Sequence, residues 1–137
     1  MSSLEEHFVI PFERSFDAHY GLEFISPTQG RVTIRADHLG ADGTVVSGVY
    51  AAMAESIAST ATAVEVLPQG QFPSGLSNAT HVVGDARQGV LEATARCRAR
   101  GVLEWLWDVE IALAGGERTA FATVAIAVRP IRGKKGV

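Results

Sequence analysis

The residue with the clearest chemical potential in this sequence is an isolated carboxylate. Residues 43–64 read GTVVSGVYAAMAESIASTATAV, and Glu55 is the one charged side chain among them. A carboxylate held in a partly desolvated place can attack a carbonyl carbon or activate a water molecule. The alternative is an ordinary solvent-facing helix carboxylate. The function of the chain depends on which of these Glu55 is.

The stretch around Glu55 is predicted to be a long helix. Its start is expected between Val46 and Gly48, with Ser47 as the N-cap, because a serine hydroxyl accepts from an otherwise unpaired backbone N–H. On a helical wheel, one side gathers the residues that we expect to face the core: Tyr50, Met53, Ala54, Ile57, Ala61 and Val64. The other side holds small residues around the carboxylate: Ala51, Ala52, Glu55, Ser56, Ser59 and Thr62. Such a face suits close approach by another surface.

The flanking sequence predicts strands on both sides of this helix. Before it, residues 22–36 alternate as a β-hairpin around a turn that contains proline and glycine. After it, a loop at 67–75 is expected to lead into four strand-like runs, at 76–83, 89–100, 101–113 and 118–128. This order predicts an α+β fold in which a curved antiparallel sheet of five to six strands wraps one long central helix.

Length and composition favour one domain over residues 1–137. We expect residues 1–20 to form a helical lead-in and residues 130–137 to be a frayed basic tail. The formal net charge of -3 is unlike the basic surface that nucleic acid requires, so no nucleic-acid partner is expected. No stretch reaches the roughly 18 to 20 apolar residues of a membrane span, and the acidic N-terminus is unlike a signal peptide. A cytoplasmic protein without a membrane partner is expected.

Cysteine and histidine usage disfavours disulfide and metal chemistry. Cys97 is the one cysteine, which rules out an internal disulfide and indicates a reducing compartment. The four histidines show no spacing typical of metal ligands: His7, His19, His38 and His81. No metal site is expected.

Several local patterns resemble the hotdog-fold acyl-CoA thioesterases. Residues 43–56, GTVVSGVYAAMAES, are similar to that family's G-x-x-H-G-G-x-x-x-x-x-x-[DE]-[ST]. Later patterns, SNAT at 77–80, WLWDV at 105–109 and AIAVRP at 125–130, resemble the branch of phenylacetate-pathway and Arthrobacter-type 4-hydroxybenzoyl-CoA thioesterases, the latter in particular. The resemblance spans about residues 20–130 and implies the hotdog fold.

The resemblance implies a site for thioester hydrolysis at the start of the helix. In it Glu55 attacks the thioester carbonyl or activates water, and Ser59, one turn later, orients that water. Backbone N–H groups at the helix N-terminus hold the carbonyl oxygen, and these match Ser47 and Gly48. Coenzyme A enters as part of the substrate, so no separate cofactor is implied.

Substrate-binding positions and an oligomer also follow from the resemblance. The SNAT pattern places Ser77, Asn78 and Thr80 among the residues that contact the substrate. Arginine suits the phosphates of a CoA nucleotide. Three arginines are candidates for this role, Arg129 above the others: Arg87, Arg129 and Arg132. The fold also implies a homodimer or a dimer of dimers, with sites at the shared interface.

Three positions before Glu55 depart from the family pattern. The family's histidine is Val46 here, the first of its paired glycines is Ser47, and its Asn or Gln seven residues earlier is Gly40. Gly40 and Val46 still correspond to substrate-binding positions, although Gly40 cannot supply an amide. His38 and Asp42 are candidates to compensate for that loss.

The sequence thus predicts an enzyme that hydrolyses a small aromatic or medium-chain acyl-CoA to the free acid and CoA. The departures at Gly40, Val46 and Ser47 favour an alternative, a hotdog module that binds acyl-CoA without hydrolysing it. A hydratase or dehydratase ranks last, because it needs a histidine paired with a carboxylate and the predicted helix contains no histidine.

Overall fold

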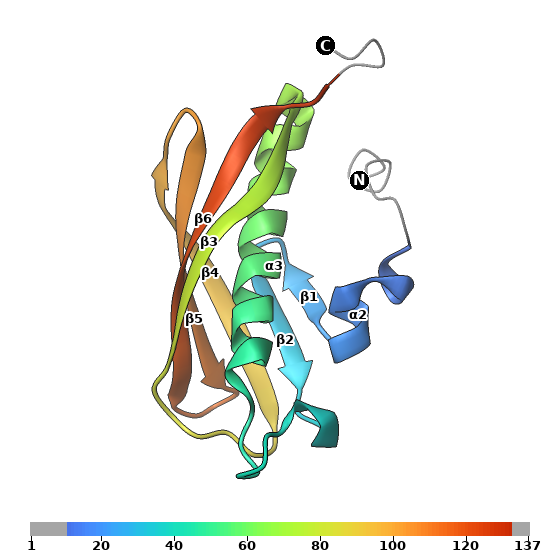
Figure 1. Ribbon diagram of the computed structural model, residues 1–137, viewed down its shortest axis with the longest axis vertical. Coiled ribbons are helices and arrows are strands. Elements are labelled where there is room, and N and C mark those ends of the chain that lie inside the picture. Colours follow the sequence, from blue (N-terminus) through green and yellow to red (C-terminus); the bar gives the residue numbers. More distant parts are fainter. Residues whose placement is uncertain (1–10, 133–137) are drawn as a thin grey trace.

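The chain folds as one long helix laid along a six-stranded antiparallel sheet (Figure 1). A computed structural model describes residues 11–132. From one edge of the sheet to the other, the strands are β1 (Glu23–Ser26), β2 (Gln29–Thr33), β4 (Val90–Arg100), β5 (Glu104–Leu113), β6 (Arg118–Pro130) and β3 (Gln71–Val82). The predicted α+β architecture is confirmed, with six strands. Part of the predicted lead-in, residues 1–10, and most of the predicted basic tail, residues 133–137, lie outside the described residues.

The long helix, α3 (Ser47–Val66), buries the larger residues of its core face. Tyr50, Met53 and Ile57 are fully buried against the inner face of the sheet. The sheet contributes the apolar side chains of alternate positions, among them Leu91, Val109, Ile111, Val124 and Ile126. Because successive strand residues point to opposite faces, the alternation read from the sequence delivers one apolar face to the helix. In the part that the structure describes, no helix combines the length and apolar character needed to cross a membrane.

Two residues of α3 lie differently from the prediction. Thr62, expected on the outer face, is fully buried, and Val64, expected in the core, is half-buried. The Thr62 hydroxyl donates to the carbonyl of Ala58 at 2.8 Å and accepts from the indole N–H of Trp107 at 2.9 Å. A hydroxyl satisfied in this way can be buried without a large penalty.

The start of α3 differs from the prediction as well, since Val46 and not Ser47 is the N-cap. Val45 donates its N–H to the carbonyl of Ala86 at 2.9 Å, and Val46 donates to that of His38 at 3.0 Å. These bonds keep the chain extended through Val46, so Ser47 becomes the first helical residue and its hydroxyl caps nothing. The helix N-terminus has no side-chain cap.

The segment after α3 is shorter as a loop than predicted. A single 3-10 turn, η3 (Leu67–Gln69), ends at Gly70, whose φ of 76° reverses the chain, and β3 begins at Gln71. Pro73 is tolerated because β3 is an edge strand, paired with β6 alone. The pairing register of β3 shifts between Gly75 and Ser77, as in a β-bulge.

Short helical turns lie near β1, and one of them contacts α3. The 3-10 turn η1 (Phe12–Arg14) and the helix α2 (Phe16–Tyr20) form the described part of the lead-in, and η2 (Ala36–His38) precedes the loop into α3. The Ser56 hydroxyl of α3 donates to the Asp17 carboxylate of α2 at 2.6 Å. This bond fastens α2 onto the middle of α3.

Candidate active site

A groove of about 400 Å³ lies between the N-terminal half of α3 and the edge strand β3. The helix side and the strand side each contribute to its lining: Ser47, Gly48, Ala51, Ala52, Glu55, Asn78 and Thr80. Three residues predicted to be catalytic therefore meet two predicted to bind substrate, although the first three lie on α3 and the other two on β3. The fold brings these two segments together.

Glu55 is the carboxylate of this groove. It follows Gly48 by seven residues, which places both on the same side of the helix. Its carboxyl group lies against the backbone of Gly75 in β3, where an added Cβ would be only 2.9 Å from the Glu55 Cδ atom. Among the described residues, Glu55 has no Lys, Arg or His partner within 4.0 Å. The carboxylate is thus exposed and uncommitted to an ion pair.

The first backbone amides of α3 are the donors of the groove. Val49 donates its N–H to the carbonyl of Val46 at 3.1 Å, but within residues 11–132 neither Ser47 nor Gly48 has an acceptor for its N–H. Unpaired amides at a helix N-terminus, together with the helix dipole, favour an oxygen that carries negative charge. The missing cap leaves these amides available to a ligand.

Asn78 and Thr80 form the strand wall of the groove. The Asn78 side-chain N–H donates to the carbonyl of Ala51 at 2.9 Å, and the Thr80 hydroxyl donates to the Asn78 side-chain oxygen at 2.6 Å. The carbonyl of Ala51 is also the one that the Glu55 N–H faces in an α-helix. The two side chains therefore fix β3 to the helical turn that carries Glu55.

Two of the three departures from the family pattern, Gly40 and Val46, lie next to each other beside the start of α3. Gly40 donates its N–H to the carbonyl of Thr44 at 2.8 Å, within a tight turn. A Cβ at Gly40 would lie 3.2 Å from a methyl carbon of Val46. The valine side chain therefore adjoins the space that a longer residue at Gly40 would enter. Neither residue lines the groove.

His38 and Asp42 are committed elsewhere and do not line the groove. His38 is buried; its Nδ1 accepts from the N–H of Arg35 at 3.1 Å, and its Nε2 lies 2.8 Å from the carbonyl oxygen of Tyr20. Asp42 accepts from both the N–H and the hydroxyl of Thr44, and these hydrogen bonds hold the pKa of the Asp42 carboxyl below its usual value. The hypothesis that they replace the missing amide gains no support.

Two predicted hydroxyl residues do not line the groove. Ser59 is half-buried and lies one turn after Glu55, farther from the N-terminus of the helix than the groove extends. Ser77 precedes Asn78 in β3 and so points to the opposite face of the sheet.

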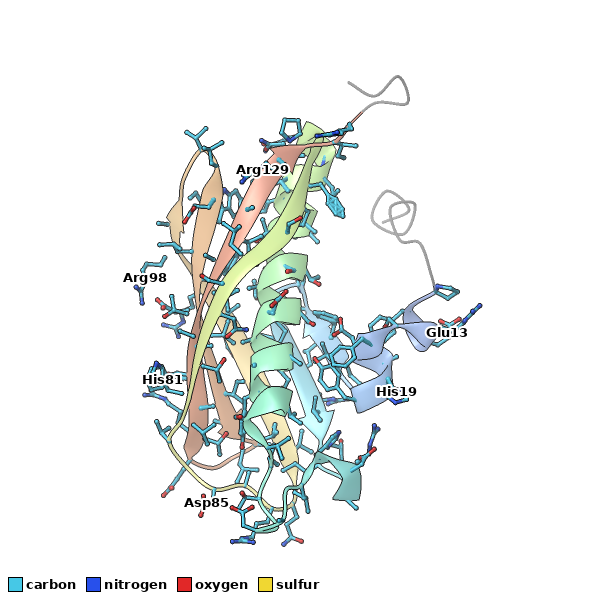
Figure 2. All side chains as sticks on the ribbon, in the orientation of Figure 1. Glu13, His19, His81, Asp85, Arg98 and Arg129 are labelled. Atoms are coloured by element: carbon cyan, nitrogen blue, oxygen red, sulfur yellow. The ribbon has the colours of Figure 1, made fainter. Side chains whose placement is uncertain are left out.

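The three candidate arginines lie at different ends of the molecule. Arg87 donates to the carbonyl of Asp42 at 2.9 Å, in the loop that leads into α3. Arg129 donates to the carbonyl of Leu103 at 2.9 Å, and Figure 2 shows it at the opposite end of the sheet, beside the C-terminal end of α3. Arg132 follows Ile131, whose N–H bonds the carbonyl of Gly70, so it lies at that end as well. Of the three, Arg87 is the candidate at the end of the molecule where α3 begins, which is also the end where the groove lies.

Sequence reasoning missed one residue of the site, Gly75. It fell within the predicted loop at 67–75, whereas it is a strand residue that touches the Glu55 carboxyl group. A glycine inside a strand marks a bulge or a close approach by another group. That signal could be used only once the segment was known to be a strand.

A sequence relative places the chain in a family, although no family model matches it. The chain is 36% identical over 102 residues to a Mycobacterium tuberculosis protein named "Putative esterase Rv1847", which covers 70% of this chain and 73% of that protein. The structure of that esterase superposes with a TM-score of 0.81 at 31% identity, covering 86% of this chain and 98% of that chain.

More distant structures share the fold. A mutant of thioesterase PA1618 from Pseudomonas aeruginosa superposes with a TM-score of 0.80 at 21% identity, covering 87% of this chain and 88% of that chain. BH2602 from Bacillus halodurans, solved with CoA, superposes with a TM-score of 0.76 at 17% identity, covering 93% and 81%. The architecture predicted from the sequence and the identity to the Mycobacterium tuberculosis protein agree: this chain is an enzyme with a hotdog-type fold and belongs to the esterase family of "Putative esterase Rv1847".

Proposed function

We propose that the enzyme hydrolyses an acyl-CoA thioester to the free acid and CoA, with Glu55 as the catalytic carboxylate. One observation carries the proposal: Glu55, which has no basic partner among the described residues, shares a groove with the unpaired amides of Ser47 and Gly48. A thioester whose carbonyl oxygen is bound at these amides would present its carbonyl carbon to the groove that Glu55 lines. This arrangement suits acyl transfer to water.

Two routes use the same residues. Glu55 could attack the carbonyl carbon to form a mixed anhydride, which water then opens, or it could take a proton from a water molecule that attacks directly. Both routes place negative charge on the carbonyl oxygen, which the Ser47 and Gly48 amides would stabilise. In both, the C–S bond breaks, and the CoA sulfur leaves and takes up a proton. When water attacks the acyl carbon of the substrate, the acid carries the oxygen of that water.

Several features support an acyl-CoA substrate. The structure of BH2602, which shares the fold, was solved with CoA. The groove, at about 400 Å³, is within the size range of small-molecule sites, and Gly48, Ala51 and Ala52 keep its helix side open. A small aromatic or medium-chain acyl group agrees with this size and with the sequence resemblance. The phenylacetate-pathway and 4-hydroxybenzoyl-CoA branch stays a prediction on the same basis.

The CoA phosphates are proposed to meet arginine side chains. Arg87 is near the start of α3, so it can serve the groove of its own chain. Arg129 and Arg132 lie at the far end of α3, which spans about 30 Å over its 20 residues. They could serve a groove only from a second copy, in the homodimer or dimer of dimers that we expect.

A thiol-release assay tests the proposal. Wild type and Glu55→Ala are compared with benzoyl-, phenylacetyl- and hexanoyl-CoA, and CoA thiol is followed over time. We expect turnover of at least one ester by wild type and a kcat about 10²- to 10⁴-fold lower in the variant, the usual effect of losing a general base. Tight binding of the esters by wild type without thiol release would instead support the non-catalytic binding module.

A further inference from the structure

We infer that Gly75 is a positioning residue for Glu55: the lack of a side chain at this point of β3 sets where the Glu55 carboxylate lies. The inference rests on the proposed catalytic role of Glu55 and adds a residue outside the groove lining. Gly75 acts through Glu55 and does not itself meet the reacting atoms.

The contact between the two residues is specific to the carboxyl end of Glu55. A Cβ built on Gly75 would have three nearest neighbours, and all three are atoms of this carboxyl group. The Cδ atom would be at 2.9 Å and Oε1 at 3.5 Å, with Oε2 nearer still. Since real Cβ atoms essentially never come closer than 3.0 Å to another group, any residue larger than glycine would displace the carboxylate.

Backbone geometry gives no other reason for glycine at this position. Gly75 is absent from the glycines with positive φ, unlike Gly70, which needs its left-handed conformation to reverse the chain. A glycine within a strand also loses stability through backbone entropy and contributes no side chain to packing. Space for the carboxylate accounts for the residue.

Neighbouring features of β3 hold the strand close to Glu55. The register shift against β6 falls between Gly75 and Ser77, and bulges of this kind re-aim strands beside active sites. Three residues after Gly75, the Asn78 side chain bonds the carbonyl of Ala51, one turn before Glu55. The carboxylate is thereby confined between the helix and a fixed strand, at the edge of the groove.

Alanine at position 75 should therefore affect catalysis more than folding. The displaced group is the far end of a flexible side chain, which can move away without unpacking the core. A displacement of about 1 Å in a reacting group can lower a rate by about 10²-fold. We expect Gly75→Ala to lower kcat by about that factor and to leave KM nearly unchanged, because the groove lining is intact.

The experiment compares wild type, Gly75→Ala, Glu55→Asp and the double variant in the thiol-release assay. Aspartate is one methylene shorter and withdraws from β3. Gly75→Ala should therefore change kcat in the Glu55→Asp background by no more than about twofold, far less than in wild type, because the effects of residues in contact do not add. Ser74→Ala, at the exposed preceding strand residue, should match wild type.

Equal losses from Gly75→Ala in both backgrounds, or a Gly75→Ala kcat within about twofold of wild type, would overturn the inference. If Gly75→Ala is poorly folded, thermal unfolding replaces kcat as the readout: the loss in Tm must disappear in the Glu55→Asp background, and a loss that persists overturns the inference too. Full activity of Glu55→Ala would instead refute the proposed function, which is a separate outcome.

Discussion

The two glutamates of α3 show how differently the two halves of the helix are used. Glu65, in the last turn, pairs with Arg100 of β4 at 3.0 Å, and the neighbouring Thr62 is buried and bonded to Trp107 of β5. Glu55, in the first half, faces a groove and has no basic partner among residues 11–132. One half of the helix is satisfied by the fold, whereas the other leaves charged and polar groups for a ligand.

The helix ends differ in the same way. At the C-terminal end the chain continues into η3, and the Gly70 N–H closes that turn on the carbonyl of Leu67 at 3.0 Å. At the N-terminal end the N-cap is Val46, a residue type that cannot bond the first amides. Replacing a good N-cap by an apolar residue typically costs about 1 kcal/mol. The open end is therefore the less stable end, and its unpaired amides are what the proposed chemistry requires.

Thr62→Val tests the packed half. The change keeps the shape but removes the acceptor of the buried Trp107 N–H. Leaving a buried donor unpaired should lower the free energy of unfolding by about 1–3 kcal/mol. Urea unfolding measures this loss, with Thr62→Ser as the control that retains the hydroxyl. The kcat per folded molecule should be unchanged; a lower kcat at wild-type stability would show that the two halves are coupled.

Val46→Ser tests the open end. A serine N-cap can accept from the Gly48 or Val49 N–H, so the free energy of unfolding should rise by about 1 kcal/mol. The same bond competes with the substrate carbonyl for the helix amides, and kcat should fall. Val46→Ala is the matched control, since it removes the methyl groups without capping. A better-capped variant with full activity would mean that these amides do not hold the carbonyl oxygen.

Glu65→Gln should have the smallest effect. The Glu65 and Arg100 side chains are both about half exposed, at 43% and 53%. Exposed ion pairs of this kind contribute about 0.2–1 kcal/mol, and salt screens them. Thermal unfolding at low and high salt should show a small difference from wild type that shrinks as salt rises. A loss above about 2 kcal/mol would mean that this end of the helix depends on the pair far more than such pairs allow.

The fold could be predicted because its signals are local. The asymmetry of residue size around α3 and the period-two alternation in β4 and β5 each lie within one element. A single long helix with strands on both sides leaves few packings. Glu55 could be predicted for a similar reason, since one charge among small helix residues is visible in the sequence itself.

The features that were predicted wrongly, or missed, depend on residues far apart in the chain. The N-cap is Val46 and not the predicted Ser47, because hydrogen bonds to the carbonyls of Ala86 and His38 hold the preceding backbone extended. Thr62 is buried because Trp107, 45 residues away, donates its indole N–H to the Thr62 hydroxyl. The contact of Gly75 with Glu55 exists only once β3 lies on α3. Local patterns carry no information on such pairs.

The most direct test of the central claim compares kcat for thiol release in two matched variants, Glu55→Gln and Glu65→Gln. Both replace one glutamate of α3 by its neutral isostere, so helix propensity and size change equally. If Glu55 is the catalytic carboxylate, its variant should lose about 10²- to 10⁴-fold in kcat while the Glu65 variant keeps the wild-type value. Equal kcat in the two variants would contradict the account.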